Sequence, residues 1–461
     1  MITESQIGVG TLRGVNAGPV KQQMVESAEN SFHSQSCAGN KEQSKALSVA
    51  LLTGGWDKPY ALGLAAALVS RGARVDFLGT SELDAPELHG SPQIRFVNLQ
   101  EAPRQGGGLA DKALRTSTYY WRTVVYAATA KPRVFHILWN TKFLLFDRTV
   151  LTLFYKLLGK RVVFTAHNVN AGKRDGNDTW LNRLTLKIQY RLVDHIFVHT
   201  EKMNAELVAD FHVRKDRVSV IPFGINSTVP NTELTSAQAR ERLGLRRSQK
   251  VILFFGNILP YKGLEYLISA FTQLAYESAD YRLIIAGKPK LTPNDCETYW
   301  NRIKNQIAES GIRARIIERY EYVPDEQTEV YFKAADVLIL PYTHIFQSGV
   351  LFLSYNFGLP VVASDVGSLK HEIVAGTTGL TCKPRDSTDL AQVIRAYFSS
   401  HLFKELEKRR LQIREFATEK YSWIKAAEVT ADSYEKLLAR DKRTAPKRVS
   451  HRRSARPRDR S

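Results

Sequence analysis

The sequence predicts an α/β protein made of two Rossmann-like domains that face each other across a cleft. Apolar runs of strand length alternate with apolar residues at helical spacing along most of the chain. This alternation occurs in two halves of similar size that join near residue 226. In each half a glycine turn, Gly54-Gly55 or Gly256, follows the first strand. Ligands of such sheets bind beyond the carboxyl ends of the strands, so both turns are candidate contacts.

The first half starts after a polar segment. Residues 1–45 are rich in Gly, Ser, Asn, Gln and Glu, and we expect them to be a disordered tail. The run over 46–52, the Gly54-Gly55 turn, a helix and a strand over 75–78 form a βαβ unit. The predicted N-terminal domain covers 46–225, with further strands at 133–139, 161–165, 196–199 and 218–222.

The second half repeats this order. The buried run from Val251 to Phe255 ends at Gly256, and a helix is predicted over 264–275. The predicted C-terminal domain covers 226–421, with further strands at 282–286, 316–317, 337–340 and 361–363 and helices at 297–310, 325–334, 349–357 and 392–421. We expect a final helix over 422–440 to cross back to the N-terminal domain, and residues 441–461 to be a basic disordered tail.

Composition narrows the class of protein. The formal net charge is +19, and +7 of it lies in residues 441–461, which favours anionic partners. Cys37, Cys296 and Cys382 are far apart and odd in number, so neither a disulfide framework nor a zinc site is indicated. No signal peptide or membrane-spanning apolar run is visible, so we expect a cytoplasmic protein.

Two stretches of the second half suit a diphosphate. Gly256 lets backbone approach a ligand, Lys262 adds a positive charge, and a helix start presents free N–H groups. Gln347, Ser348 and Gly349 offer an amide, a hydroxyl and backbone N–H groups at the start of another helix. The alternative is an ordinary strand-to-helix loop with a solvated lysine. Neither an Asp-x-Asp motif nor a ligand cluster is present, so we expect no metal or other cofactor.

In order along the chain, these motifs resemble the GT-B fold glycosyltransferases of the large retaining family 4. The resemblance covers roughly residues 46–439. Phe254-Phe255-Gly256-Asn257 with Lys262-Gly263 is similar to the family's phosphate loop, although Asn257 stands where an arginine is usual. Further matches are Val220-Ile221-Pro222-Phe223-Gly224-Ile225, Ile285-Ala286-Gly287, Tyr322-Val323-Pro324, Ala335-Asp336-Val337, Leu340-Pro341, Gly358-Leu359-Pro360-Val361-Val362-Ala363-Ser364, Gly367, Glu372-Ile373-Val374 and Gly379-Leu380.

The chain departs from the family pattern at one place. Two glutamates, seven residues apart, usually precede the Gly-Leu-Pro segment. Here Ile345 and Leu353 occupy those positions. Neither side chain can bind a sugar or ribose hydroxyl as a carboxylate does, so donor recognition differs or catalysis has been lost.

The resemblance implies a transfer of sugar from a nucleotide-diphosphate sugar, with retention of anomeric configuration and no protein nucleophile. Lys262 would stabilise the departing diphosphate, helped by backbone donors of Gly256, Ser348, Gly349 and Val350. His167 follows a strand of the first half and would lie near the donor sugar. Gly54 and Gly55 would close on the diphosphate, and Glu372 would either orient the donor or cap its own helix. We expect structural roles for His136, His195 and His199.

The acceptor is expected to be a glycan or a lipid-linked molecule. In the helix predicted over 180–192, the apolar stripe Leu181, Leu184, Ile188 and Leu192 lies beside Arg183, Lys187 and Arg191. This pattern suits either an anionic membrane surface or a solvated basic face. Nucleic acid is disfavoured because the basic tail lacks interleaved aromatic residues. Two other functions remain open: a sugar-nucleotide epimerase, and a nucleotide-sugar-binding protein without turnover.

Overall fold

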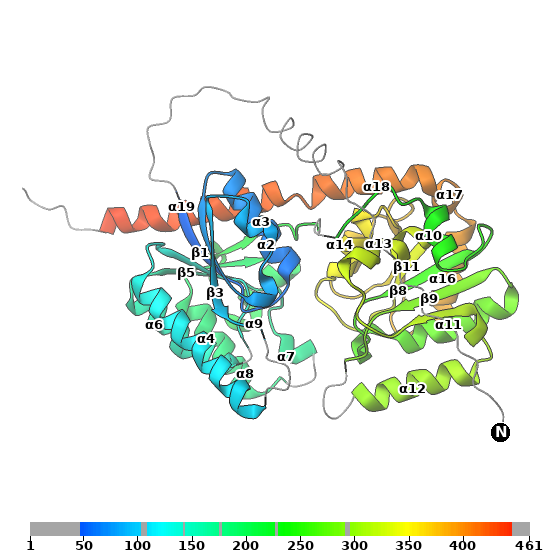
Figure 1. Ribbon diagram of the computed structural model, residues 1–461, viewed down its shortest axis with the longest axis horizontal. Coiled ribbons are helices and arrows are strands. Elements are labelled where there is room, and N and C mark those ends of the chain that lie inside the picture. Colours follow the sequence, from blue (N-terminus) through cyan, green and yellow to red (C-terminus); the bar gives the residue numbers. More distant parts are fainter. Residues whose placement is uncertain are drawn as a thin grey trace, which may run out of the picture. The chain divides into compact units, whose positions relative to one another are not determined.

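The computed structural model describes residues 47–102, 108–141, 143–174, 178–225, 229–290 and 296–444. The predicted tail over 1–45, the predicted join at residue 226 and residues 445–461 lie outside this part of the chain. Within it, the predicted α/β class is confirmed: two parallel sheets alternate with helices (Figure 1). No helix in the described ranges is both long and apolar enough to cross a membrane.

The first sheet has seven strands in the order β3-β2-β1-β4-β5-β6-β7, all parallel. Alternate residues of β1 face opposite sides, with Val49 and Leu51 in one buried cluster and Ala50 and Leu52 in the other. The strands are β1 (Ser48–Leu52), β2 (Arg74–Thr80), β3 (Ile94–Gln100), β4 (Val134–Ile137), β5 (Arg161–Thr165), β6 (His195–Val198) and β7 (Val218–Val220).

Helices cover both faces of this sheet. On one face lie α2 (Lys58–Ser70), α3 (Pro86–His89) and the last helix, α19 (Trp423–Thr444), which packs against α2. α19 ends four residues beyond the end of the predicted helix. The other face carries α4 (Leu109–Thr129), the π-helical turn η2 (Asp147–Leu151), α6 (Thr152–Leu157), α8 (Trp180–Leu192) and α9 (Glu201–Phe211). The remaining short elements are η1 (Ser81–Leu83), α5 (Leu144–Phe146), α7 (Ala171–Arg174) and η3 (Lys215–Arg217).

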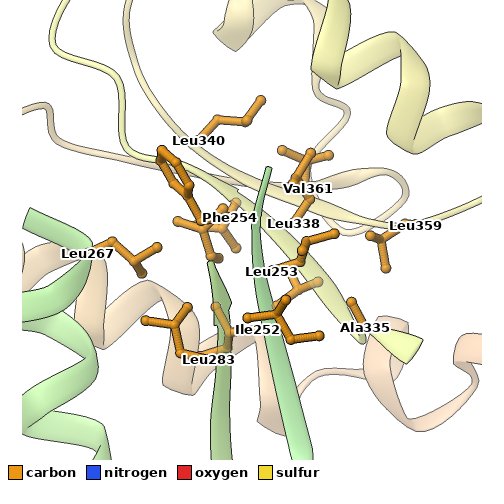
Figure 2. Close-up of a cluster of buried hydrophobic side chains, with 14 of the residues drawn as sticks. Ile252, Leu253, Phe254, Leu267, Leu283, Ala335, Leu338, Leu340, Leu359 and Val361 are labelled. Carbon is orange, nitrogen blue, oxygen red and sulfur yellow. The ribbon is translucent and has the colours of Figure 1, made fainter. Parts of the chain in front are cut away.

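The second sheet has six parallel strands in the order β10-β9-β8-β11-β12-β13. Its core forms where Ile252, Leu253 and Phe254 of β8 pack with Leu338 of β11 and Val361 of β12 (Figure 2). The strands are β8 (Lys250–Phe255), β9 (Tyr281–Ala286), β10 (Ile316–Arg319), β11 (Val337–Leu340), β12 (Val361–Ser364) and β13 (Gly379–Cys382).

The helices of this half are α10 (Ser236–Arg242), α11 (Leu264–Glu277), α12 (Cys296–Glu309), α13 (Asp325–Ala334), α14 (Gly349–Asn356), α15 (Leu369–Glu372), α16 (Ser387–Ser399), α17 (His401–Lys404) and α18 (Leu406–Lys420), with the short turns η4 (Pro260–Lys262) and η5 (Arg313–Arg315).

Candidate donor site

A cavity of about 350 Å³ lies at the carboxyl end of the second sheet. Its lining includes five of the residues or backbone positions singled out from the sequence: Lys262, Gln347, Ser348, Gly349 and Val350. They come from two segments, η4 after β8 and the start of α14 after β11, which pair as neighbouring strands. The structure therefore brings the two predicted diphosphate segments together.

Lys262 is a buried cation in this cavity, with its side chain 7 % exposed. Its Nζ lies 5.4 Å from the ring centroid of Tyr342. No salt bridge joins Lys262 to an acidic group of the described residues. Burial lowers the pKa of Lys262 below the ordinary lysine value. A charge held this way gains most from an anionic ligand, because a buried cation without a counter-ion is costly.

Gly256 leaves room beside that ammonium. The backbone there has φ +97°, and a Cβ would lie 3.1 Å from Lys262 Nζ and 3.4 Å from Val350 Cγ2. The missing side chain thus keeps open the space between β8, Lys262 and α14.

The start of α14 belongs to the lining of the cavity. Its N-cap, Ser348, makes no side-chain capping bond, so the amides of Gly349 and Val350 have no partner from the cap or from helix geometry. Beside them, Gln347 Oε1 is buried and has no hydrogen-bond partner among the described groups. The sequence also suggested amides from the helix after Lys262, but α11 does not contribute to the lining.

Two apolar side chains stand in the same lining at the positions where the resemblance would place glutamates. Ile345 and Leu353 are both 7 % exposed and both line the cavity. These two positions are therefore in the cavity, and they present aliphatic surface there instead of a carboxylate.

Residues of the first half of the chain also line this cavity. They include Asp57, Tyr60 and Gly224, together with Trp423 at the start of α19. Asp57 caps α2, accepting a hydrogen bond from Tyr60 N at 3.2 Å, and burial raises its pKa. It is the one acidic side chain among the described lining residues. Sequence reasoning missed it, although an Asp two residues before Pro59, after a glycine turn, is a helix-cap signal at a strand end.

His167 is not part of the cavity lining, but it contacts Tyr60, which is. Its imidazole stacks on Trp139, with centroids 4.1 Å apart, and meets Tyr60 edge-on at 4.6 Å. Nδ1 is 3.1 Å from His199 Nε2, whereas Nε2 is buried without a partner among the described groups. Burial, and then the neighbouring imidazoles, lower its pKa well below the ordinary value. The lowered pKa favours the neutral imidazole, which packs against Tyr60 and Trp139. The catalytic role of His167 stays a prediction.

The other predicted residues lie elsewhere. Gly54 and Gly55 line a second cavity of about 940 Å³ in the first half of the chain. Asn257 is exposed outside both linings. Glu372 is buried, but it belongs to neither lining. Its carboxylate accepts a hydrogen bond from Tyr421 and lies 3.4 Å from Lys420 Nζ. These contacts tie α15 to the end of α18, so its role toward a donor stays a prediction.

No cluster of three or more His, Cys, Asp or Glu side chains that could hold a metal ion occurs in the described ranges. The buried histidines of the described residues, His136, His195 and His199, all have protein partners. His136 contacts Tyr434 Oη at 2.5 Å and Thr165 Oγ1 at 2.7 Å. His195 contacts Ser219 Oγ at 2.9 Å.

Replacement of Gly263, which follows Lys262, is expected to disturb the site. It has φ +65°, and a Cβ would lie 2.0 Å from the carbonyl oxygen of Pro341. Gly263→Ala should therefore lower the stability and weaken nucleoside diphosphate binding, because the chain must shift beside Lys262. Gly376→Ala is the matched control: φ is +73° with nothing within 4 Å of the Cβ, so it should cost only about 1–2 kcal/mol. Urea unfolding and ligand titration measure both; equal effects would contradict the clash.

Comparison with known proteins finds glycosyltransferase families over both halves of the chain. Residues 59–229 match the family described as Glycosyltransferase Family 4, and residues 235–420 match Glycosyl transferases group 1. The D-inositol 3-phosphate glycosyltransferase of Corynebacterium efficiens is 28 % identical over 71 % of this chain and 78 % of its own length. That of Corynebacterium glutamicum is 25 % identical over 83 % and 92 %.

Solved structures share the fold. Sucrose-phosphate synthase from Thermosynechococcus elongatus superposes with a TM-score of 0.67 at 21 % identity, covering 86 % of this chain and all of that one. The Anabaena protein HepE in complex with UDP-glucose has a TM-score of 0.64 at 16 % identity, covering 85 % and 99 %. These likenesses establish the two-domain fold.

Proposed function

Because this chain belongs to the GT-B glycosyltransferases of family 4, we propose that it moves a sugar from a nucleotide-diphosphate sugar to a glycan or lipid-linked acceptor. One observation carries the proposal: Lys262 is a buried ammonium without an acidic partner in the described residues, in one cavity with the uncapped start of α14. A diphosphate would accept hydrogen bonds from those amides and pair with that charge.

In the proposed transfer the bond between the anomeric carbon and the diphosphate oxygen breaks, and an acceptor oxygen bonds to that carbon. The acceptor's proton passes to the departing diphosphate, on the same face of the sugar, so configuration is retained. Lys262 and the α14 amides stabilise the charge that develops on the diphosphate. We propose that these groups suffice without a metal, since they already supply positive charge where it is needed.

The acceptor is assigned to the second cavity. It lies at the carboxyl end of β1, and its lining includes Lys112 and Arg115 of α4 together with Tyr120. Basic side chains beside aromatic ones suit an acceptor that carries a phosphate and a sugar or polyol. The similar corynebacterial proteins are named D-inositol 3-phosphate glycosyltransferases, and a phosphorylated polyol of that kind agrees with this chemistry.

Two observations favour functions other than sugar transfer. Ile345 and Leu353 in the donor lining favour a nucleotide-sugar-binding protein without turnover. Asp57, whose pKa is raised by burial, would be a proton-transfer group for a sugar-nucleotide epimerase, but no second carboxylate joins it among the described lining residues.

A panel of nucleotides and nucleotide sugars should distinguish these functions. We expect a nucleoside diphosphate and its sugar ester to raise the unfolding temperature, and the monophosphate to do so less, because a ligand at 100 times its Kd stabilises by about 2.7 kcal/mol. With an acceptor glycan, transfer should release nucleoside diphosphate. A thermal shift without release would indicate a binder, and an isomerised nucleotide sugar an epimerase. No shift with any member would contradict the donor site.

A further inference from the structure

The first half of the chain exposes an unusual amount of apolar side chain. Of the 21 exposed large hydrophobic residues in the described part of the chain, 15 lie between Leu109 and Leu184. Trp121 is 69 % exposed, Leu157 77 % and Trp180 74 %. Scattered apolar residues on a surface are ordinary, but a concentration of this kind marks an interaction surface.

These residues share one side of the molecule. Buried residues of α4, η2–α6 and α8, such as Tyr126, Tyr155 and Tyr190, all enter the same core cluster against one face of the first sheet. The opposite sides of these helices therefore all point outward, away from the sheet. Figure 1 shows α4, α6 and α8 side by side. We call this surface the apolar face; it comprises Leu114, Trp121, Val125, Phe143, Leu144, Leu145, Phe146, Val150, Leu153, Leu157, Trp180, Leu181 and Leu184.

Contacts between the three helical segments make the face continuous. The ring of Phe146 in α5 packs edge-on against Tyr120 of α4, with centroids 5.1 Å apart. Arg148 Nη1 donates to Asn182 Oδ1 at 2.9 Å and to Thr185 Oγ1 at 3.1 Å, which joins η2 to α8. The outward residues 146, 150, 153 and 157 follow helical spacing, so they form one stripe.

The charge around the apolar face is basic. Residues 109–129, 143–158 and 180–192 carry eight Lys and Arg but only two Asp. Arg148 and Asp147 are buried, which leaves seven cations and one carboxylate outside the core. On α8, Lys187 and Arg191 are exposed and form no salt bridge with a described residue. The sequence pattern of α8 suits either a membrane surface or a solvated basic face. In the structure Leu181 and Leu184 are exposed as well, while Thr185, Leu186, Gln189 and Tyr190 form the buried side.

We propose that the apolar face docks on the surface of an anionic lipid bilayer. Exposed Leu and Phe side chains would enter the acyl boundary, the two Trp rings would lie at the interface, and the basic residues would contact lipid phosphates. A second copy of the chain fits less well, because symmetric pairing would bring the same basic residues against each other. Docking is independent of the proposed reaction. If the proposed acceptor is also right, the second cavity, lined by Tyr120 and Phe143, opens beside the lipid head groups.

Vesicle co-sedimentation of the full chain tests this proposal. We expect binding to vesicles that contain phosphatidylglycerol and weaker binding to phosphatidylcholine alone. The variant L145Q/L157Q/W180Q should lose at least about tenfold in partition coefficient, because each exposed apolar side chain contributes through burial. The matched control Y322Q/L411Q/I424Q removes exposed apolar residues elsewhere and should bind like the unmodified chain. K187Q/R191Q should lose about fivefold per charge on anionic vesicles only.

Three results would overturn the proposal. The unmodified chain could fail to sediment with either vesicle. The apolar-face variant could sediment as well as the unmodified chain, in which case the cations of residues 445–461 would account for binding. The unmodified chain could be a dimer in light scattering, and the variant a monomer, with no vesicle binding by either; a second copy would then cover the face. Unfolding temperatures of all variants verify that each is folded.

Discussion

Replacing Lys262 by alanine should lower the turnover number about 10²- to 10³-fold and remove most of the affinity for nucleoside diphosphate. The reason is electrostatic: the ammonium is buried in the donor cavity, where a charge acts on a developing anion with little screening. Steady-state kinetics and calorimetric titration measure the two losses. Because the cation has no acidic partner in the described residues, Lys262→Met should leave the free protein at least as stable as before.

Lys250→Met is the matched control for this change. Lys250 opens β8, and its Nζ also lies over an aromatic ring, 4.9 Å from the Tyr281 centroid, but it is outside the cavity. It should retain activity and affinity. Equal losses in both variants would contradict a specific role of Lys262 in diphosphate binding and would point to a general effect of losing a lysine in or just after β8.

Lys262 should also make the stability of the free protein and its affinity for diphosphate depend on pH, each with a defined sign. Burial lowers its folded-state pKa below the ordinary value of about 10.4. Between the two pKa values the unfolded chain holds more protons, so stability of the free protein should rise with pH there. Diphosphate affinity should fall as pH rises through the folded-state pKa, because the ligand prefers the ammonium. Lys262→Met should abolish both trends; unchanged trends would assign them to another group.

The sequence predicted the central strands of both sheets but missed an edge strand of each. β3 and β13 stand at the ends of their strand orders. β3 mixes Arg95 and Asn98 with apolar residues, and only Leu99 of its seven residues is fully buried. β13 has four residues and begins with a glycine. Edge strands bury fewer residues than central ones, so their apolar signal is weak, and tertiary pairing decides whether they form.

The lining of the candidate donor cavity was predictable where its residues are close in sequence. Lys262 and Gly256 lie on one strand–loop–helix unit, and Ser348 and Gly349 start one helix, so local pattern located them. Trp423 was missed because its position depends on distant residues. Its ring fills the space over Gly63 and Gly224, where a Cβ would lie 2.3 and 2.0 Å from the indole, and no local pattern encodes that fit.

For His167, the sequence predicted the position along the chain but not the surroundings of the side chain. Its place after a strand of the first half was inferred correctly, since β5 ends at Thr165. The ring, however, is covered by Tyr60 and Trp139, which come from α2 and from the loop after β4. Whether a side chain enters a cavity depends on such neighbours, so strand position alone did not determine its exposure.

Removing the carboxylate of Asp336 should cost the fold about 3–5 kcal/mol. Asp336 Oδ1 accepts from Arg240 Nη2 at 2.6 Å, and Oδ2 accepts from the amide of Val251 at 2.7 Å. Both side chains are 8 % exposed. Asp336→Ala would leave the buried Nη2 of Arg240 and the first buried amide of β8 without their carboxylate acceptor. Urea unfolding measures the loss, and β8 leads to Gly256 and the donor cavity, so affinity for nucleoside diphosphate should fall with stability.

A contrast with an exposed pair makes this prediction specific. Arg395 Nη2 lies 2.7 Å from Glu277 Oε1, at the same kind of distance, but the two side chains are 37 % and 47 % exposed. Glu277→Ala should cost less than about 1 kcal/mol, because solvent screens this pair and replaces the lost partner. Similar losses in the two variants would contradict the argument from burial.

The double variant R240M/D336L separates the pair's attraction from the cost of an unpaired charge. Burial raises the pKa of Asp336 despite the adjacent guanidinium, so desolvation outweighs the attraction there. Replacing both partners should therefore cost less than Asp336→Ala alone. Some loss should remain, since Arg240 also donates to the carbonyl oxygens of Ala334, Arg247 and Gln249. A double variant less stable than Asp336→Ala would mean that those backbone contacts, and not the carboxylate, fasten α10 to the start of β8.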